Sequence, residues 1–309
     1  MPEPVDDCIR IGSFAFVPGD DDAEAGMIPG FDELWHTVGA GMAFDSMGFE
    51  RFTKMSRPVE DYVVECVRAT LRRSGVEASA VDHIVFSTGD CTFRHLRDDF
   101  VAYVLDALGA VNCVPLVLSY RQCCSSQAAL AYGRQLFDDP AVQHVVVAAF
   151  DFNADDEDRV RPFAIFGDAA AACIIGRGAA AGLRLASAAA GVDHDGLMGR
   201  DTVASRQRVA ARALHDVYRD GGIAAGEVTR VFPSNLFKPL AQFNAAAVGI
   251  DARRLHFDAT RQRYGHCGNT DWMINLVDYE QTVGFNDGEA YLALASAPGF
   301  FACSLLVAA

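Results

Sequence analysis

Two adjacent cysteines, Cys123 and Cys124, are the residues of this sequence best placed to do chemistry. A mostly apolar run, residues 114–118, leads into them and a helical pattern follows from Ala128, so we expect a strand, a tight turn and a helix. This order places the pair at a helix N-terminus, where the helix dipole and free backbone N–H groups stabilise a thiolate. Cys124 is the predicted nucleophile and Cys123 its buried neighbour. The competing interpretation is that both are small core residues, the commoner role of a free cysteine.

The elements that must position these thiols follow from hydrophobic periodicity. Residues 59–73 are expected to form an amphipathic helix with one apolar stripe, ended by Gly75. Residues 143–150 are almost continuously apolar, as buried parallel strands are. Further strands are expected at 9–17, 82–90, 114–118, 169–176, 182–190, 226–235 and 254–257, with a final hairpin of 289–295 and 302–308. Further helices are expected at 31–36, 100–108, 125–138, 203–218, 237–248 and 272–283, and residues 19–30 are expected to be a solvated loop.

Strands alternate with helices in this pattern, which predicts an α/β fold. The pattern also divides into two halves of similar order, and the small-residue strand 169–176 resembles the strand 301–308 near the end of the chain. With 309 residues and 51% hydrophobic composition, the chain can build a large core in one domain or in two fused halves. The similar order of elements in the two halves is weak evidence for an internal duplication.

Charge and composition exclude several classes of function. The formal net charge is −15 and the pI is about 4.8, so a broad nucleic-acid interface is not expected. The same charge gives little general attraction to an acidic carrier protein, whose docking would need a local basic patch. A dehydrogenase is disfavoured because no predicted strand is followed by a GxGxxG motif.

The nine cysteines indicate the cellular compartment. Their number is odd, several lie in apolar runs, and none forms a CxxC pair. We therefore expect free thiols in a reducing cytoplasm, with neither a disulfide framework nor a structural zinc site. The acidic start of the chain has no apolar segment typical of a signal peptide, and no apolar run is long enough to cross a bilayer. A cytoplasmic protein without membrane segments is predicted.

Four motifs in a particular order carry a family resemblance. They are the cysteine stretch 119–127, the Phe-Gly-Asp-Ala turn at 166–169, the Gly-Asn-Thr turn at 268–270 and the final hairpin with Gly299. In this order they resemble the thiolase superfamily, most closely the type III β-ketoacyl-ACP synthases. The resemblance implies the five-layered αβαβα thiolase fold, with residues 1–176 carrying the nucleophilic cysteine and 177–309 carrying the His/Asn pair and the oxyanion glycine. It also implies a homodimer.

The resemblance assigns roles to individual residues. Cys124 stands at the nucleophile, and Asn269 stands at the catalytic asparagine. The backbone N–H groups of Cys124 and Gly299 would form the oxyanion hole, in which such donors are worth roughly 3 kcal/mol of transition-state stabilisation. Trp35, after Asp-Glu-Leu, resembles a tryptophan near the family's CoA entrance. The Phe-Gly-Asp-Ala turn would be structural.

One departure from the family pattern affects the predicted reaction. The family's histidine is replaced here by Ser234, in the run Pro-Ser-Asn at 233–235. Serine is neutral, cannot act as a base near pH 7, and is a weaker hydrogen-bond donor than imidazolium. Ordinary decarboxylative condensation with a malonyl thioester is therefore in doubt.

His266 could supply the missing imidazole. The run 265–271 resembles the Gly-His-x-x-Gly-x-Asp turn of ketosynthase-like acyltransferases. His266 would then be a general base that deprotonates either the nucleophilic thiol or the acceptor, and Asp271 would orient it. The alternatives are that His266 is an ordinary turn histidine and that Asp271 caps the helix after it.

The remaining predicted site residues concern the substrate. Arg159, Arg161 and Lys238 could contact a pantetheine phosphate or a carrier, although isolated basic residues are usually just solvated. Asn235 and Phe300, beside Ser234 and Gly299, complete the predicted substrate-binding set.

Together these features predict an acyltransferase that transfers an acyl group from acyl-CoA or acyl carrier protein, through an acyl-Cys124 thioester, to a small-molecule acceptor. The thioester is the substrate, and no cofactor or metal is expected. The predicted setting is polyketide or other secondary metabolism, close to lipid metabolism. Two alternatives stay open: a decarboxylative β-ketoacyl synthase with a modified triad, and a non-catalytic partner subunit of a ketosynthase.

Overall fold

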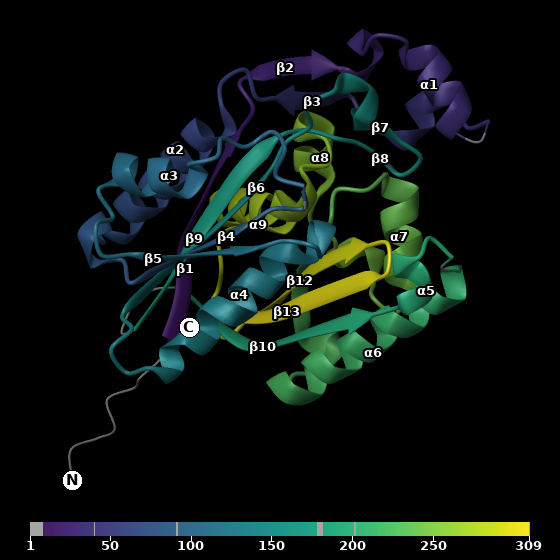
Figure 1. Cartoon of the computed structure of the whole chain (residues 1–309). Helices are drawn as coiled ribbons and strands as arrows, with labels where there is room; N and C mark the ends of the chain where they lie inside the picture. Colours follow the sequence, from purple (N-terminus) through teal and green to yellow (C-terminus); the bar gives the residue numbers. More distant parts are fainter. Residues whose placement is uncertain (1–8, 40, 91, 178–181, 201, 309) are drawn as a thin grey trace.

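The fold is built on one mixed sheet that consists of two half-sheets (Figure 1). The computed structural model describes residues 9–39, 41–90, 92–177, 182–200 and 202–308. In this part of the chain the strands of the large sheet follow the order β11-β12-β13-β10-β1-β9-β6-β4-β5. The half-sheets meet where β1 and β10 pair antiparallel, Ile11 opposite Leu183.

The strands of the first half-sheet are β1 (Ile9–Pro18), β4 (His83–Ser87), β5 (Val114–Leu118), β6 (His144–Asp151) and β9 (Ala169–Arg177). Those of the second are β10 (Leu183–Val192), β11 (Val228–Phe232), β12 (Ala290–Ala297) and β13 (Phe300–Ala308). Two small ribbons pair β2 (Asp21–Glu24) with β3 (Arg51–Lys54), and β7 (Val160–Arg161) with β8 (Ala164–Ile165). The helices are α1 (Phe31–Val38), α2 (Val59–Ser74), α3 (Phe100–Leu108), α4 (Ser125–Gln135), α5 (His194–Leu197), α6 (Val203–Gly221), α7 (Lys238–Ala247), α8 (Asp258–Tyr264) and α9 (Asp271–Thr282).

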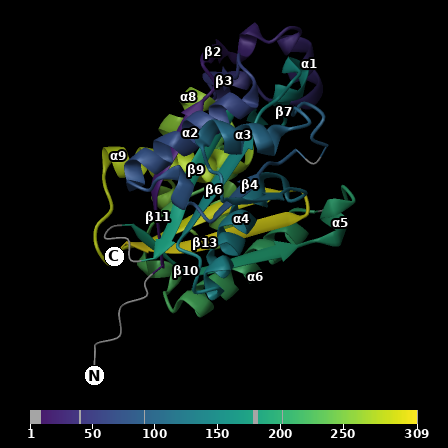
Figure 2. The same cartoon turned by 60° about the vertical axis from the view of Figure 1, so that its left-hand side comes forward.

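Helices α4 and α9 lie between the two half-sheets (Figures 1 and 2). One core cluster joins Leu130 of α4 and Trp272 of α9 to Val147 in the first half-sheet and to Tyr291 in the second. The outer face of the first half-sheet is covered by α2 and α3, and that of the second by α6 and α7. The order across the molecule is therefore helix, sheet, helix, sheet, helix. The nearly continuous apolar run of β6 is explained by this layering, since its alternate side chains enter two different cores.

The two half-sheets repeat one strand order. The first runs β5-β4-β6-β9-β1 and the second β11-β12-β13-β10, with Leu255 bridged to Val231 on the outer side of β11. When the strands of each half are numbered by their order in the chain, the first half-sheet has the spatial order 3-2-4-5-1. The second half-sheet has the same order if the bridge at Leu255 is counted as its third strand. The division into 1–176 and 177–309 stays a prediction; residues 178–181, next to that boundary, lie outside the described residues.

Most elements predicted from periodicity are present, with ends shifted by a few residues, but two predictions were wrong. The expected strand 254–257 is reduced to the single bridge at Leu255, because a 3₁₀ turn ends at Arg254 and α8 begins at Asp258. The expected solvated loop 19–30 contains β2, which pairs with β3. Helix α8 was not predicted, since its sequence has almost no apolar residues. No helix in the described part of the chain is long and apolar enough to cross a membrane.

Two turns, one from each half, are joined through their backbones at the carboxyl end of α8. The N–H of His266 donates to the carbonyl of Ile165 at 2.8 Å, and the N–H of Gly167 donates to the carbonyl of His266 at 3.0 Å. Phe166 and His266 form a parallel bridge through this exchange. Such an approach needs a glycine at 167, since a Cβ there would overlap the carbonyl oxygen of Tyr264.

The variant Gly167→Ala is expected to lower the free energy of unfolding by about 2–3 kcal/mol, because the added methyl group must push the two turns apart. Urea denaturation followed by circular dichroism measures this change. The matched control is Gly176→Ala in β9, where the nearest atom to the new Cβ is the carbonyl oxygen of Gln143 at 3.7 Å. Equal midpoints for the two variants would contradict the packing argument.

Candidate active site

The cysteine pair lies on a strained turn between β5 and α4. Tyr120 and Gln122 both adopt positive φ, +65° and +48°, which is uncommon for residues other than glycine. Residues 122–124 then form one 3₁₀ turn that runs directly into α4. Such backbone strain costs of order 1–3 kcal/mol per residue and gathers at functional sites. The turn therefore supports a functional role for the side chains that it presents.

The two thiols differ in exposure, in the opposite sense to the prediction. Cys123 is half-buried, whereas Cys124 is 1% exposed and packs against Ala295 of β12 and Ala302 of β13. Burial raises the pKa of the Cys124 thiol well above its usual value. The expectation that Cys123 is the buried neighbour was wrong. Adjacent residues at a helix start point about 100° apart, and here the β12–β13 hairpin covers the second of them.

Cys123 contacts His266. The Sγ atom of Cys123 lies 3.4 Å from Nε2 of His266, and Nδ1 of His266 is hydrogen-bonded to Oδ2 of Asp271. His266 and Asp271 are each 1% exposed. Burial lowers the pKa of His266, but the Asp271 carboxylate and Cys123 outweigh it, so this pKa lies well above its usual value. Thiol, imidazole and carboxylate thus form the chain of groups that activates a cysteine nucleophile.

Backbone groups fix Asp271 in this position. Its Oδ1 accepts the N–H of Cys267 and its Oδ2 the N–H of Asn235, both at 2.7 Å. Asp271 is the first residue of α9, whose N-cap is Thr270, and its carboxylate does not cap that helix. The geometry favours the orienting role over the cap.

The aromatic ring of Phe166 holds the other side of His266. Its centroid lies 4.6 Å from that of the imidazole, and Phe163 stands further out at 6.3 Å. The Phe-Gly-Asp-Ala turn of the first half therefore packs directly on the imidazole of the second. Since the backbones of 165–167 and 266 are also bonded, the imidazole has little freedom to turn away from Cys123.

Asn269 is hydrogen-bonded on both sides of its amide. Its Nδ2 donates to the carbonyl of Phe150 at 3.1 Å and to Oδ2 of Asp151 at 2.8 Å, and its Oδ1 accepts from Ser87 at 2.9 Å. No hydrogen bond to Cys123 or His266 is found for it in the described part of the chain. The catalytic role expected for Asn269 thus stays a prediction without geometric support; its bonds are those of a residue that joins the two halves.

Sequence reasoning missed Asp151. This half-buried residue accepts, through its carboxylate, the backbone N–H groups of Gly89 at 2.6 Å and of Asn269 at 2.7 Å. Burial raises the pKa of Asp151, although bonds from Asn269, Gly89 and Thr88 oppose this. A signal was available, because Asp151 directly follows the apolar run 143–150, at the carboxyl end of a parallel strand.

The oxyanion hole does not take the expected form. The N–H of Cys124 donates to the carbonyl of Arg121 at 2.9 Å, so it is already occupied. The N–H of Cys123 lies in the first turn, where amides have no acceptor within the helix. Gly299 is buried in the β12–β13 turn with φ +75°, and Phe300 packs beside Cys124. A role for the Gly299 N–H stays a prediction.

Asn235 contacts the Asp271 carboxylate through its backbone N–H. Asn235 is fully buried, donates its Nδ2 to the carbonyl of Gly265 at 3.2 Å, and accepts from Asn275 at 3.0 Å. It therefore supports Asp271 and is not available to a substrate, contrary to the prediction. Ser234 is 5% exposed, and its carbonyl accepts the N–H of Leu236.

Two other predicted substrate contacts, Trp35 and Arg159, have structural partners. Trp35 is buried against Phe44 and donates Nε1 to the carbonyl of Met42 at 2.8 Å. Arg159 is 1% exposed and binds both carboxylate oxygens of Asp168, at 2.7 and 2.9 Å, which contradicts its predicted contact with a phosphate.

Two exposed basic residues are paired at the surface. Arg161 pairs with Asp158 at 2.8 Å, and Lys238 pairs with Asp258 at 2.5 Å. Both stay available to a ligand. Among the described residues, no group of three or more His, Cys, Asp and Glu side chains is arranged to hold a metal ion.

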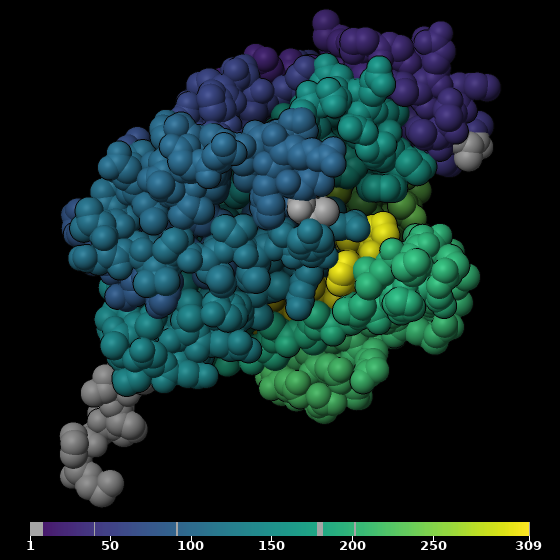
Figure 3. Space-filling model, viewed as in Figure 1, coloured from purple at the N-terminus to yellow at the C-terminus, as the bar shows by residue number. Residues whose placement is uncertain are grey.

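A hollow in the surface exposes part of the C-terminal segment (Figure 3). In this view yellow atoms are visible between a blue part of the first half and the green part of the second that contains α5. The β12–β13 hairpin carries these last residues and packs on Cys124.

Comparison with solved structures shows the fold. At 97% coverage of this chain and 98% of theirs, it superposes on ChlB3, described as an acyltransferase, with a TM-score of 0.82 and 14% identity, and on 3-oxoacyl-(acyl carrier protein) synthase III, FabH, from Xanthomonas oryzae pv. oryzae, with 0.82 and 13%. A variant of OleA from Xanthomonas campestris gives 0.80 and 12% at the same coverage. No family model and no curated protein matches the sequence. The chain therefore has the α/β thiolase-like fold, as the sequence predicted.

The geometry predicts that iodoacetamide labels Cys123 and spares Cys124, which tandem mass spectrometry of the 119–134 region measures. The raised pKa of His266 favours the charged imidazole, and a cation beside Cys123 favours the reactive thiolate of that cysteine. Removing the carboxylate in Asp271→Asn lowers that pKa, so the imidazole loses its proton at a lower pH. With fewer charged imidazoles beside Cys123, labelling at pH 7 should slow about tenfold.

The control for this measurement is Asp278→Asn, which removes a carboxylate that pairs with His256 elsewhere in the fold. Its labelling rate should equal that of the unchanged protein. Faster labelling of Cys124 than of Cys123, or no effect of Asp271→Asn, would contradict the assignment.

Proposed function

We propose that this protein is an acyltransferase that carries its acyl group as a thioester on Cys123. The observation that supports this most directly is the chain Cys123–His266–Asp271, with its 3.4 Å contact between Sγ and Nε2, at the start of α4. Sequence reasoning put the thioester on Cys124, but that thiol is buried against Ala295 and Ala302. The proposal therefore moves it by one residue.

The proposed reaction has two steps. The Cys123 thiolate attacks the carbonyl carbon of an acyl thioester, the bond from that carbon to the donor sulfur breaks, and His266 gives its proton to the departing thiolate. In the second step Nε2 of His266 takes the proton from an acceptor hydroxyl or amine as its oxygen or nitrogen attacks the acyl carbon. Cys123 then leaves as the thiolate. Asp271 keeps Nδ1 as the protonated nitrogen throughout, and the reaction calls for no resident cofactor or metal.

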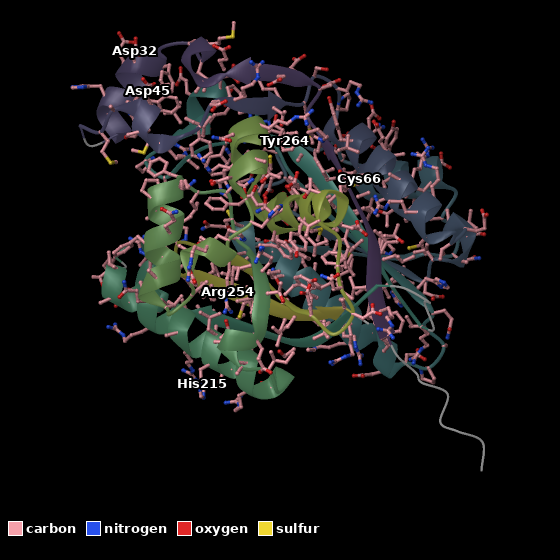
Figure 4. All side chains as sticks on the ribbon, turned by 180° about the vertical axis from the view of Figure 1, so that it is seen from behind. Asp32, Asp45, Cys66, His215, Arg254 and Tyr264 are labelled. Carbon is pink, nitrogen blue, oxygen red and sulfur yellow. The ribbon has the colours of Figure 1, made fainter. Side chains whose placement is uncertain are left out.

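The charge distribution favours a carrier protein as the donor. Residues 183–263 hold 12 Lys and Arg against 8 Asp and Glu, in a chain that totals 26 against 41. On α6 the exposed residues Arg208, Arg212, His215 and Arg219 follow a helical spacing of four, three and four, and so share one face. His215 projects from the outer side of the molecule (Figure 4).

This α6 face is the local basic patch that docking of an acidic carrier would need. Arg219 is compensated by Asp216 and Asp220. Arg208 and Arg212 have no carboxylate within ion-pair distance among the described residues. Acyl-CoA, with its phosphates, is the alternative donor.

The alternatives from the sequence have less support. A decarboxylative synthase would use the position of Ser234 and the amide of Asn269, and that amide already donates to Phe150 and Asp151. A non-catalytic subunit would have no need to keep a buried, oriented imidazole against a cysteine. The loss of the family histidine at Ser234 favours a specialised reaction, and we place it in polyketide or other secondary metabolism.

The setting follows from the thiols. Seven cysteines lie in the described part of the chain and all are free, with Cys66, Cys173 and Cys267 deeply buried. Free thiols persist in a reducing compartment, so we place the protein in the cytoplasm.

We further propose a homodimer through the β5 edge. In the described residues β5 pairs on one side only, with β4, and ends the sheet. Val114, Val117 and Tyr120 are 56%, 39% and 71% exposed. An apolar, unpaired edge strand invites pairing with another chain. A second copy would also cover the turn that leads to Cys123.

The test of the proposed function is intact-protein mass spectrometry after incubation with acyl-CoAs and with acylated carrier protein. A mass gain equal to the acyl group is expected in the unchanged protein and in Cys124→Ala, and none in Cys123→Ala. In His266→Ala the loading rate should fall at least about 100-fold. Loading of Cys123→Ala together with no loading of Cys124→Ala would return the nucleophile to Cys124.

Size-exclusion chromatography with light scattering tests the dimer. The unchanged protein should have twice the mass of one chain, and Val117→Lys should have the mass of a monomer, since a buried charge would oppose pairing at the β5 edge. The control is Val203→Lys at the start of α6, also exposed at 52%, which should stay dimeric. A monomeric unchanged protein would refute the dimer.

A further inference from the structure

A side chain that the proposed mechanism does not use has an unsatisfied group in the core. Gln127 of α4 is 2% exposed. Its Oε1 accepts a hydrogen bond from Ser304 of β13, but its Nε2 is buried without a partner among the described residues. A buried amide hydrogen without an acceptor costs free energy, and native proteins rarely keep one without a reason. Leucine or methionine would fill the same space at no such cost.

The position of Gln127 connects this group to the thiols. It follows Cys123 by four residues and Cys124 by three, so its side chain leaves the helix between theirs, about 6 Å further along the axis. Ser304 lies two residues from Ala302 on β13, and alternate residues of a strand face the same side. Ala302 contacts Cys124. The amide therefore lies in the layer between α4 and the β12–β13 hairpin, one helical turn beyond the cysteines.

The side chains of this layer are small. Cys124 packs there with Ala295 and Ala302, and with Ala297 and Phe300 at the edge. Two polar groups of the described residues meet there: the hydroxyl of Ser304, which donates to Gln127, and the Gln127 amide, whose Nε2 has no acceptor.

We propose that the Gln127 amide hydrogen-bonds a hydroxyl group on the acyl chain held by Cys123, so that hydroxyacyl groups are the preferred substrates. This inference rests on the proposed function. The helical rise from Cys123 to Gln127 matches a hydroxyl on about the third to fifth carbon of the acyl chain. A hydroxyl both donates and accepts, so it satisfies the amide whichever way its nitrogen and oxygen are placed. A site with a buried polar group discriminates strongly against an analogue that leaves that group unpaired.

The experiment compares loading of Cys123 by 3-hydroxybutyryl-CoA and by butyryl-CoA, which differ only in the hydroxyl. Quenched-flow mass spectrometry gives the ratio of the two rates. We expect a ratio of at least ten for the unchanged protein, and below two for Gln127→Met, which keeps the volume and removes the amide. The matched control, Gln135→Met, alters an exposed residue of the same helix and should keep the full ratio.

A second variant guards against misfolding of Gln127→Met. Ser304→Ala keeps the amide but removes the group that orients it, so the ratio should fall at least threefold. A ratio near one in the unchanged protein overturns the inference, and so does an undiminished ratio in either variant; both results would indicate that water satisfies the amide. If neither acyl group loads onto Cys123, the proposed function fails and the inference fails with it, whereas loading without preference overturns the inference alone.

Discussion

The site depends on two carboxylates, one buried and one half-buried, that hold the turn of residues 265–271. Asp151 reaches this turn from the first half and accepts the N–H of Asn269, and Asp271 accepts the N–H of Cys267 from within the turn. A buried carboxylate is costly unless donors surround it. A turn at the centre of the molecule is equally costly unless its N–H groups find acceptors. The N–H groups of the turn satisfy the carboxylates, and the carboxylates satisfy the turn. Because Asp151 belongs to the first half, the turn can form only where the two halves have come together.

His266 gains its position from this mutual dependence. Its ring is fixed by Asp271 on one nitrogen and by the packing of Phe166, while its backbone is bonded to Ile165 and Gly167 of the other half. Gly268 shows how tight the arrangement is, since a Cβ at that position would overlap the Asp151 carboxylate and its φ is +62°. The Gly-Asn-Thr motif that carries the family resemblance is thus explained by packing alone.

The sequence predicted the layers well and the site only in part. Apolar periodicity was sufficient to predict α2 and β6, because an element that is buried on one or two faces needs apolar residues at regular positions along its sequence. It was insufficient for α8, which has almost no apolar residues, and for Leu255, where neighbouring turns leave room for a single bridge. The roles of Cys123 and Cys124 could not be separated, because their exposure depends on the β12–β13 hairpin, about 170 residues further along the chain. Arg159 looked like a phosphate ligand for a similar reason, since its partner Asp168 is a matter of tertiary structure.

The number of polar groups that face the reacting carbonyl sets the chemistry that the site can support. Decarboxylation builds negative charge on a second thioester carbonyl, which needs a donor pair of its own beside the one that holds the first oxyanion. Here Ser234 stands where the family resemblance implies a histidine, and both amide hydrogens of Asn269 bond to protein acceptors. One imidazole is left, and it is aimed at the thiol. A single acid–base group that serves first the departing sulfur and then the attacking acceptor is sufficient for acyl transfer, in which each step moves one proton. The same replacement that weakens the case for condensation therefore strengthens the case for transfer.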